Sequence, residues 1–138
     1  MGKSVRDLMT QNPRAVRPDD TVVDAARMMR DENVGSLPVV DSDRLIGMVT
    51  DRDVSVRVVA EGRDPSEVSV QEIASRNPVT AEATSDLNEA LQLMARHQVR
   101  RLPVTDEGRL VGIIAQADVA GEIGDKQTGR LVEAISEP

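Results

Sequence analysis

Cysteine and all three aromatic residue types are absent from this chain of 138 residues. Without cysteine the chain can form no disulfide, and it offers no thiolate as a nucleophile or a metal ligand. Without Phe, Tyr and Trp it cannot stack nucleobases on aromatic side chains, which is the usual device of proteins that bind single-stranded nucleic acids. The core must therefore be built from Val, Ile, Leu, Met and Ala.

Long apolar runs and excess positive charge are missing as well. No run approaches the roughly 20 apolar residues that a membrane-spanning helix needs, and residues 1–7 contain no apolar signal region. The chain has 24 acidic and 17 basic residues, a net charge of −7. That charge argues against broad binding to a nucleic-acid backbone, which needs a positive field. We expect a cytoplasmic protein that binds neither membrane nor nucleic acid.

The strongest positive signal is an internal repeat with an offset of about 65 residues. Residues 4–54 align with the second copy without gaps. The matching pairs include Asn12-Pro13 with Asn77-Pro78, Leu37-Pro38-Val39 with Leu102-Pro103-Val104, Gly47 with Gly112, and Asp53-Val54 with Asp118-Val119. Two copies are too few for an open solenoid, so we expect a duplicated unit that closes on itself as a pair.

Each copy predicts the same order of elements. Thr21 with Asp24 forms a capping-box pattern ahead of an amphipathic helix, and Asp86 with Glu89 repeats this pattern. The other elements expected in the first copy are a helical turn at 5–9, a strand at 15–17, a hairpin of strands 36–40 and 44–50 turning at 41–43, and a helix from Asp51. In the second copy we expect a hairpin over 101–115 turning at 106–108 and a helix from Gln116. Residues 127–135 predict a short amphipathic helix with Leu131, Val132 and Ile135 on one side.

The duplicated order and its local strings resemble the cystathionine-β-synthase (CBS) domain family. The strings are Val34–Asp41 with Leu45–Asp53, and Val99–Asp106 with Leu110–Ile114. The whole chain is similar to the small stand-alone CBS-pair proteins of bacteria, including the actinobacterial hypoxic response type. The resemblance implies an α+β fold of two tandem β-α-β-β-α motifs, related by a pseudo-twofold with their sheets packed together (a Bateman module). We place the first motif at 1–62, a linker at 63–69 and the second motif at 70–138.

The family also implies a function. The clefts between paired CBS motifs in relatives hold AMP, ADP, ATP or S-adenosylmethionine, and many members are homodimers. The resemblance therefore implies a regulatory, non-catalytic module whose ligand is adenosyl-based and which requires no cofactor. Since the chain carries no effector domain, its output would pass to an unknown protein partner or to its own dimer.

Thr50 and Asp53 are the leading candidates for ligand contact in the first copy. A strand is expected to end at Thr50 and a helix to begin there, and a helix start attracts phosphate. The Asp53 carboxylate suits a pair of ribose hydroxyls, and the matching residue of relatives grips the ribose. The same two residues also form an ordinary capping box, so the local sequence leaves both roles open.

The second copy keeps Asp118 but has Ala115 in place of the threonine. We therefore expect the first cleft to bind more strongly and the second to be weaker or empty. Arg100 and Arg101 precede the second Leu-Pro pair, where relatives place phosphate contacts, although a solvated basic edge is the equal alternative. Strand alternation suggests that only one of them faces the cleft. The expected ligand set is completed by Arg52, Val16, Leu37, Pro38 and Pro103.

Catalysis finds little support in the sequence. His97 is the only histidine, and no partner ligands lie at metal-binding spacing from it. The Asp41-Ser42-Asp43 stretch lacks the glycine and the terminal glutamate of a calcium loop, so we interpret it as a hairpin turn. Two non-enzymatic alternatives remain open, a sensor of an adenosyl ligand and a ligand-free protein-interaction module. A hydrolase using carboxylates alone is a remote third.

Overall fold

The computed structural model describes residues 3–122. The chain divides into two compact units, which we call the continuous unit (residues 14–78) and the split unit (residues 1–13 with 79–138). Over the described residues the fold is α+β, with seven strands and six α-helices. The α+β prediction is thereby confirmed. The predicted helix at 127–135 lies outside the described residues.

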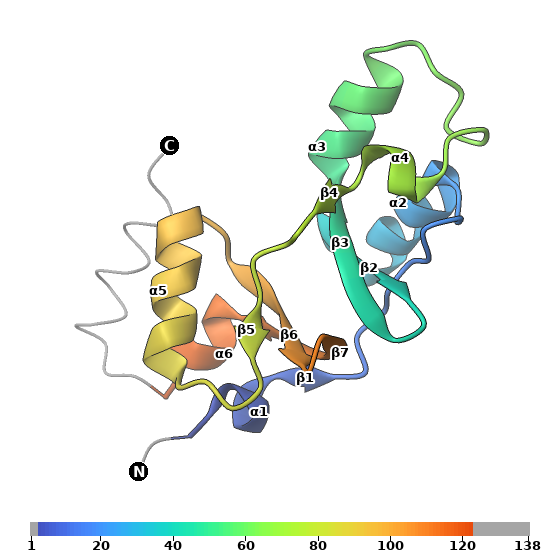
Figure 1. Ribbon diagram of the computed structural model, residues 1–138. Helices are drawn as coiled ribbons and strands as arrows, with labels where there is room; N and C mark the ends of the chain where they lie inside the picture. The colour runs from blue at the N-terminus through green and yellow to red at the C-terminus, as the bar shows by residue number, and fades with distance from the viewer. Residues whose placement is uncertain (1–2, 123–138) are drawn as a thin grey trace. The chain divides into compact units, whose positions relative to one another are not determined.

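The continuous unit contains one long helix, a hairpin and several short elements (Figure 1). In chain order these are α2 (Val22–Glu32), β2 (Ser36–Asp41), β3 (Arg44–Thr50), α3 (Asp51–Val54), the π-helical segment η1 (Ser55–Val59), α4 (Val70–Ile73) and β4 (Ser75–Arg76). β2 and β4 both pair antiparallel with β3. The expected strand at 15–17 is reduced to a single parallel bridge between Val16 and Val39.

The split unit repeats this plan. Its elements are α1 (Val5–Leu8), β1 (Thr10–Gln11), β5 (Ala81–Glu82), α5 (Leu87–His97), β6 (Arg101–Asp106), β7 (Arg109–Ala115) and α6 (Gln116–Ala120). β6 pairs antiparallel with β7, β1 pairs antiparallel with β7, and β5 runs parallel to β6. Figure 1 shows blue β1 lying against orange β7, far apart in sequence.

Helix caps follow the sequence pattern closely. The Thr21 hydroxyl accepts a hydrogen bond from the Asp24 N–H, and the Asp24 carboxylate accepts one from the Thr21 N–H. In the second copy the Asp86 carboxylate accepts from the N–H groups of both Asn88 and Glu89. The described residues show no return bond from the Glu89 side chain, so the expected second capping box is a one-sided cap. A single Asp oxygen satisfies both free N–H groups, which leaves the helix start stable without the return bond.

Both predicted hairpin turns are present with two-residue loops. Asp41 pairs with Arg44, and Asp106 pairs with Arg109. The loop residues have positive φ, at 51° for Ser42, 69° for Asp43, 53° for Glu107 and 81° for Gly108. Positive φ at both central positions is the geometry that matches the twist of the flanking strands. The interpretation of residues 41–43 as a hairpin turn is therefore confirmed.

The first helix and strand of each copy pack with the body of the other copy. We call residues 4–13 and 69–78 the lead segments. The Val5 N–H donates to the Ser85 carbonyl oxygen at 2.9 Å, and the Arg6 N–H donates to that of Ala83 at 3.0 Å. The Val70 N–H donates to the Asp20 carbonyl oxygen at 2.8 Å, and the Gln71 N–H donates to the Pro18 carbonyl oxygen at 3.0 Å.

These four bonds are the same two contacts made twice at equivalent positions of the repeat. Val5 is fully buried in the split unit's core with Leu91, Leu102 and Ile114. Val70 and Ile73 are buried in the core of the continuous unit. Each unit therefore combines one copy's lead segment with the other copy's hairpin and helices. The motif boundaries drawn from the repeat apply to the sequence. The boundaries between the compact units lie elsewhere, after Pro13 and after Pro78.

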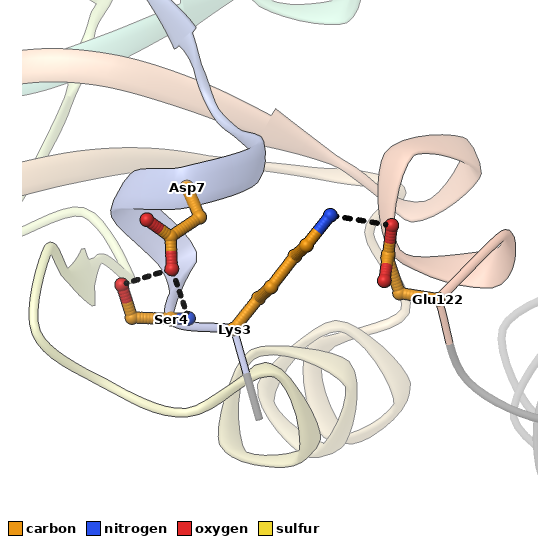
Figure 2. Close-up of polar contacts among 4 residues, drawn as sticks. All are labelled: Lys3, Ser4, Asp7 and Glu122. Atoms are coloured by element: carbon orange, nitrogen blue, oxygen red, sulfur yellow. Dashed lines mark hydrogen bonds and ion pairs between the residues drawn. The ribbon is translucent and has the colours of Figure 1, made fainter. Parts of the chain in front are cut away.

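Ionic and capping contacts fasten the first lead segment at its start. Figure 2 shows the Ser4 N–H and hydroxyl both donating to Asp7 Oδ2, at 2.8 and 3.2 Å. In the same view Lys3 Nζ lies 3.1 Å from Glu122 Oε1. Arg6 adds an ion pair to Asp106 at 3.0 Å. These pairs are exposed, so each adds little, and buried Val5 is the main anchor.

Glycines permit the short strands of the lead segments to lie against the hairpins. A Cβ placed on Gly47 would stand 2.5 Å from the Ser75 carbonyl oxygen. A Cβ on Gly112 would stand 2.5 Å from Met9 Sδ and 2.8 Å from the Thr10 oxygen. The two glycines occupy equivalent positions of the repeat, so both copies require this close backbone approach.

A charged cap holds the second lead segment, and we expect it to make stability depend on pH. Glu72 accepts from the Ser69 N–H at 2.7 Å and from Arg63 at 2.8 Å. These bonds, the Ser69 one first, hold the pKa of Glu72 below its ordinary value. A carboxylate with a lowered pKa in the folded protein contributes stability above its unfolded pKa. That contribution is lost as the pH falls through the folded pKa.

Replacing Glu72 by Gln should therefore lower the melting temperature at about pH 6 and have a much smaller effect at about pH 3. Thermal melts of wild type and E72Q across this range measure the difference. Exposed Glu67 in the same linker region provides the control, because E67Q removes a carboxylate that caps no helix. A constant gap between wild type and E72Q at every pH would show that the charge of Glu72 is not the stabilising feature.

Candidate ligand-binding corners

Each unit contains one strand-to-helix corner that carries a candidate aspartate. We call Thr50–Asp53, between β3 and α3, the first corner, and Ala115–Asp118, between β7 and α6, the second corner. Both follow a seven-residue strand of the hairpin, which sets the position of the corner at the end of the sheet. The repeat thus places the two candidate aspartates at equivalent points of the two units.

The first corner forms the capping box that the sequence allowed. The Thr50 N–H donates to Asp53 Oδ2 at 2.9 Å, and the Asp53 N–H donates to Thr50 Oγ1 at 3.1 Å. Asp53 Oδ1 lies outside the box, 3.8 Å from Arg57 Nε, and the side chain is only 13% exposed. One carboxylate oxygen and the Thr50 hydroxyl hydrogen therefore remain to contact a ligand while the cap stays intact.

The helix that begins at the first corner changes to π-helical geometry after one turn. α3 ends at Val54 and η1 follows directly from Ser55 to Val59. π-helical turns are rare and often occur at functional sites. Sequence reasoning missed this segment, since its residues carry no signal that separates a π-turn from an α-turn.

The second corner forms half of the same device. The Ala115 N–H donates to Asp118 Oδ2 at 3.0 Å, but alanine has no side-chain oxygen to cap α6. The backbone N–H of Gln116 donates to the Arg100 carbonyl oxygen at 2.7 Å, as that of Asp51 donates to Gly35 at 2.9 Å in the first corner. Asp118 is exposed, and its Oδ1 bonds no described residue.

The structure brings the predicted arginines to the second corner. Arg101 is the cross-strand partner of Ala115, and Arg100 is bonded through its carbonyl oxygen to the first residue of α6. Both side chains are exposed, and neither forms an ion pair with any residue in the range 3–122. Arg52, on α3, is exposed at the first corner. A phosphate contact by these three residues stays a prediction.

The predicted apolar contacts are core residues. Val16 and Leu37 are 1% and 2% exposed and belong to the core of the continuous unit, and Pro38 and Pro103 are buried. Their side chains are occupied by packing in the described protein. Their role in ligand contact remains a prediction.

Between residues 3 and 122 no three His, Cys, Asp or Glu side chains are grouped as a metal site would need. No helix in that range combines the length and apolar character required to cross a bilayer. His97 ends α5 with an exposed side chain.

Comparisons with known proteins identify the repeat. The family model described as the CBS domain matches residues 5–59 and again residues 70–125. The chain is 42% identical over 134 residues to the CBS domain-containing protein YhcV of Bacillus subtilis, covering 96% of this chain and 95% of that protein. It is 38% identical over 136 residues to Hypoxic response protein 1 of Mycobacterium tuberculosis, covering 98% and 95%.

Solved structures of similar fold include ligand complexes. Hypoxic Response Protein I with two coordinated zinc ions matches with a TM-score of 0.80 at 39% identity, covering 88% of this chain and all of that one. CBSX2 in complex with AMP matches with a TM-score of 0.75 at 28% identity, covering 87% of this chain and 95% of that one. The CBS domain pair of MJ0100 in complex with 5'-methylthioadenosine and S-adenosyl-L-methionine matches with a TM-score of 0.76 at 25% identity. The match covers 91% of this chain and 99% of that one.

Proposed function

Because the chain belongs to the CBS domain family, we propose that it is a non-catalytic regulatory module that binds an adenine nucleotide at its strand-to-helix corners. One observation carries the proposal. Asp53 and Asp118 each commit one carboxylate oxygen to a backbone N–H, and the second oxygen makes no hydrogen bond to the described chain, although that of Asp53 lies in a long ion pair with Arg57 at 3.8 Å. A carboxylate held in this way presents a fixed acceptor, which suits a ribose hydroxyl. The complexes of CBSX2 and MJ0100 with adenosyl compounds support the ligand class.

Charge favours a phosphate-bearing ligand. Arg100 and Arg101 are exposed and form no ion pair with the described residues. Guanidinium groups bind phosphate through charge-assisted hydrogen bonds. AMP, ADP and ATP supply that partner, whereas S-adenosylmethionine carries a positive sulfonium and no phosphate. We therefore propose AMP, ADP or ATP ahead of S-adenosylmethionine.

The test uses two aspartates with the same capping role. Asp53→Ala and Asp24→Ala each remove the acid of a Thr-Asp capping box in the continuous unit, at a cost of about 1 kcal/mol of stability. Only D53A should also weaken nucleotide binding, by about tenfold to a hundredfold, since it removes a carboxylate contact to a hydroxyl. Calorimetric titration with AMP measures affinity, and thermal melting measures the common loss of stability.

The second candidate function is a ligand-free protein-interaction module. Alanine at position 115 favours it, because the second corner lacks a hydroxyl to contact a ligand. Thermal shift with AMP, ADP, ATP and S-adenosylmethionine separates the two functions. A ligand at a hundred times its dissociation constant stabilises the folded state by about 2.7 kcal/mol. No shift with any of the four would favour the interaction module.

We also propose that the chain forms a homodimer and acts on a separate protein partner. Val56 and Val59, both on η1, are 48% and 67% exposed. A contact between two copies of this face would bury both valines. Native mass spectrometry of the whole chain should report twice the monomer mass, together with any retained nucleotide. Val59→Glu should return the monomer. The expected cytoplasmic location stays a prediction.

Zinc is not part of the proposal. The structure of Hypoxic Response Protein I holds two zinc ions. This chain has one histidine and no cysteine, so it lacks most of the nitrogen and sulfur ligands that zinc prefers.

A further inference from the structure

The side-chain nitrogen of Gln116, a half-buried residue of the second corner, is itself buried and has no hydrogen-bond partner among the described residues. Gln116 is the first residue of α6. Over the described residues, its Nε2 is the buried side-chain nitrogen or oxygen that makes no hydrogen bond. Buried polar groups in folded proteins are nearly always paired, so a single exception at a candidate ligand site requires an explanation.

A backbone hydrogen bond fixes the main chain at Gln116. The Gln116 N–H is bonded to the Arg100 carbonyl oxygen at 2.7 Å, which holds the start of α6 against the start of β6. Asp118 follows two residues later, with Oδ1 outside its capping bond. The first corner has exposed Asp51 at the equivalent position. The buried donor is therefore a feature of the second corner alone.

From these contacts we infer that Gln116 is a specificity-determining residue of the second corner, whose Nε2–H donates to an acceptor in the adenosine part of the bound nucleotide. The inference rests on the proposed function and extends it to one atom. The second corner holds this donor together with Arg100 and Arg101, which form no ion pair with the residues in the range 3–122.

The chemistry of the donor selects the part of the ligand. Gln116 Nε2 is neutral and buried, and burying a phosphate charge beside a neutral amide would carry a high desolvation cost. A ring nitrogen or a ribose oxygen is a neutral acceptor that can be buried at low cost. The phosphate is served better by Arg100 and Arg101, which are exposed and charged.

The test is a variant that keeps the shape and removes the donor. Gln116→Met has a similar length and no N–H, and Gln116→Leu is the second choice if Q116M does not fold. We expect the dissociation constant for AMP to rise by about tenfold to a hundredfold. The melting temperature of the ligand-free variant should be unchanged or raised, because an unpaired buried donor has been removed. Gln92→Leu, at an exposed position of α5, should change neither quantity by a comparable amount.

A purely structural role for Gln116 gives a different result. In that case the ligand-free melting temperature of Q116M would fall, and this would overturn the inference. Equal AMP affinity in wild type and Q116M would overturn it too, while leaving the proposed function standing. If wild type binds none of AMP, ADP, ATP and S-adenosylmethionine, the proposed function and the inference fail together.

Discussion

Replacing Val5 by Asp is expected to unfold the helices and hairpin of the second copy, residues 81–119, and to leave those of the first copy, residues 16–58, folded. Val5 is fully buried in the core of the split unit, where an aspartate would place an unpaired charge. We expect a loss of about 4 kcal/mol of stability, confined to that unit. Hydrogen exchange measured by mass spectrometry should show faster exchange over residues 81–119 and little change over residues 16–58.

Val70→Asp is the reciprocal control. Val70 is equally buried, but it lies in the core of the continuous unit. V70D should therefore accelerate exchange over residues 16–58 and spare residues 87–119. Faster hydrogen exchange of residues 16–58 in V5D would contradict the packing of each lead segment against the body of the other copy.

Gly47→Ala is expected to detach β4 from β3. The new Cβ would meet the Ser75 carbonyl oxygen at 2.5 Å, and a backbone atom within a paired strand cannot move aside without breaking the pairing. Overpacking of this kind costs about 3 kcal/mol. Chemical denaturation measures the loss, and hydrogen exchange should locate it in residues 69–78.

Gly121→Ala is the matched control for this substitution. Gly121 has φ −72° and ψ −19°, and a Cβ there meets nothing within 4 Å. Alanine at such a position restricts the unfolded chain and should stabilise the protein by about 0.5–1 kcal/mol. Similar destabilisation by G47A and G121A would show that loss of glycine flexibility, rather than the contact with Ser75, is responsible.

Local elements were predictable from the sequence because their signals are local. The Thr21-Asp24 cap and the turns at Ser42-Asp43 and Glu107-Gly108 depend on neighbouring residues only. The packing of each lead segment against the body of the other copy was not predictable, because the two lead segments share one sequence pattern. Ser4-Val5 and Ser69-Val70 begin them alike, so either segment satisfies the apolar pattern of either body. Choosing between the bodies requires long-range contacts that no local pattern encodes.

The candidate site was predictable only in part. Thr50 and Asp53 form the capping box, and Asp53 still holds an oxygen outside it, so the two roles weighed from the sequence are compatible. Gln116 gave no signal, because burial without a partner is a property of the folded protein. The expected preference for the first corner stays a prediction, because the Thr50 hydroxyl caps α3 through its oxygen and keeps its hydrogen for a ligand.

The packing of each lead segment against the other copy also sets the order in which the two units can fold during synthesis. Residues 14–78 are contiguous, so every part of the continuous unit has been synthesised before the second hairpin begins. Residues 3–13 are translated before the continuous unit, but their partners Ala83, Ser85 and β7 are translated after it. Domains fold as units during synthesis, from the N-terminal side first. Val5 is therefore translated well before the residues that bury it, and its core cannot close until β7 has been synthesised.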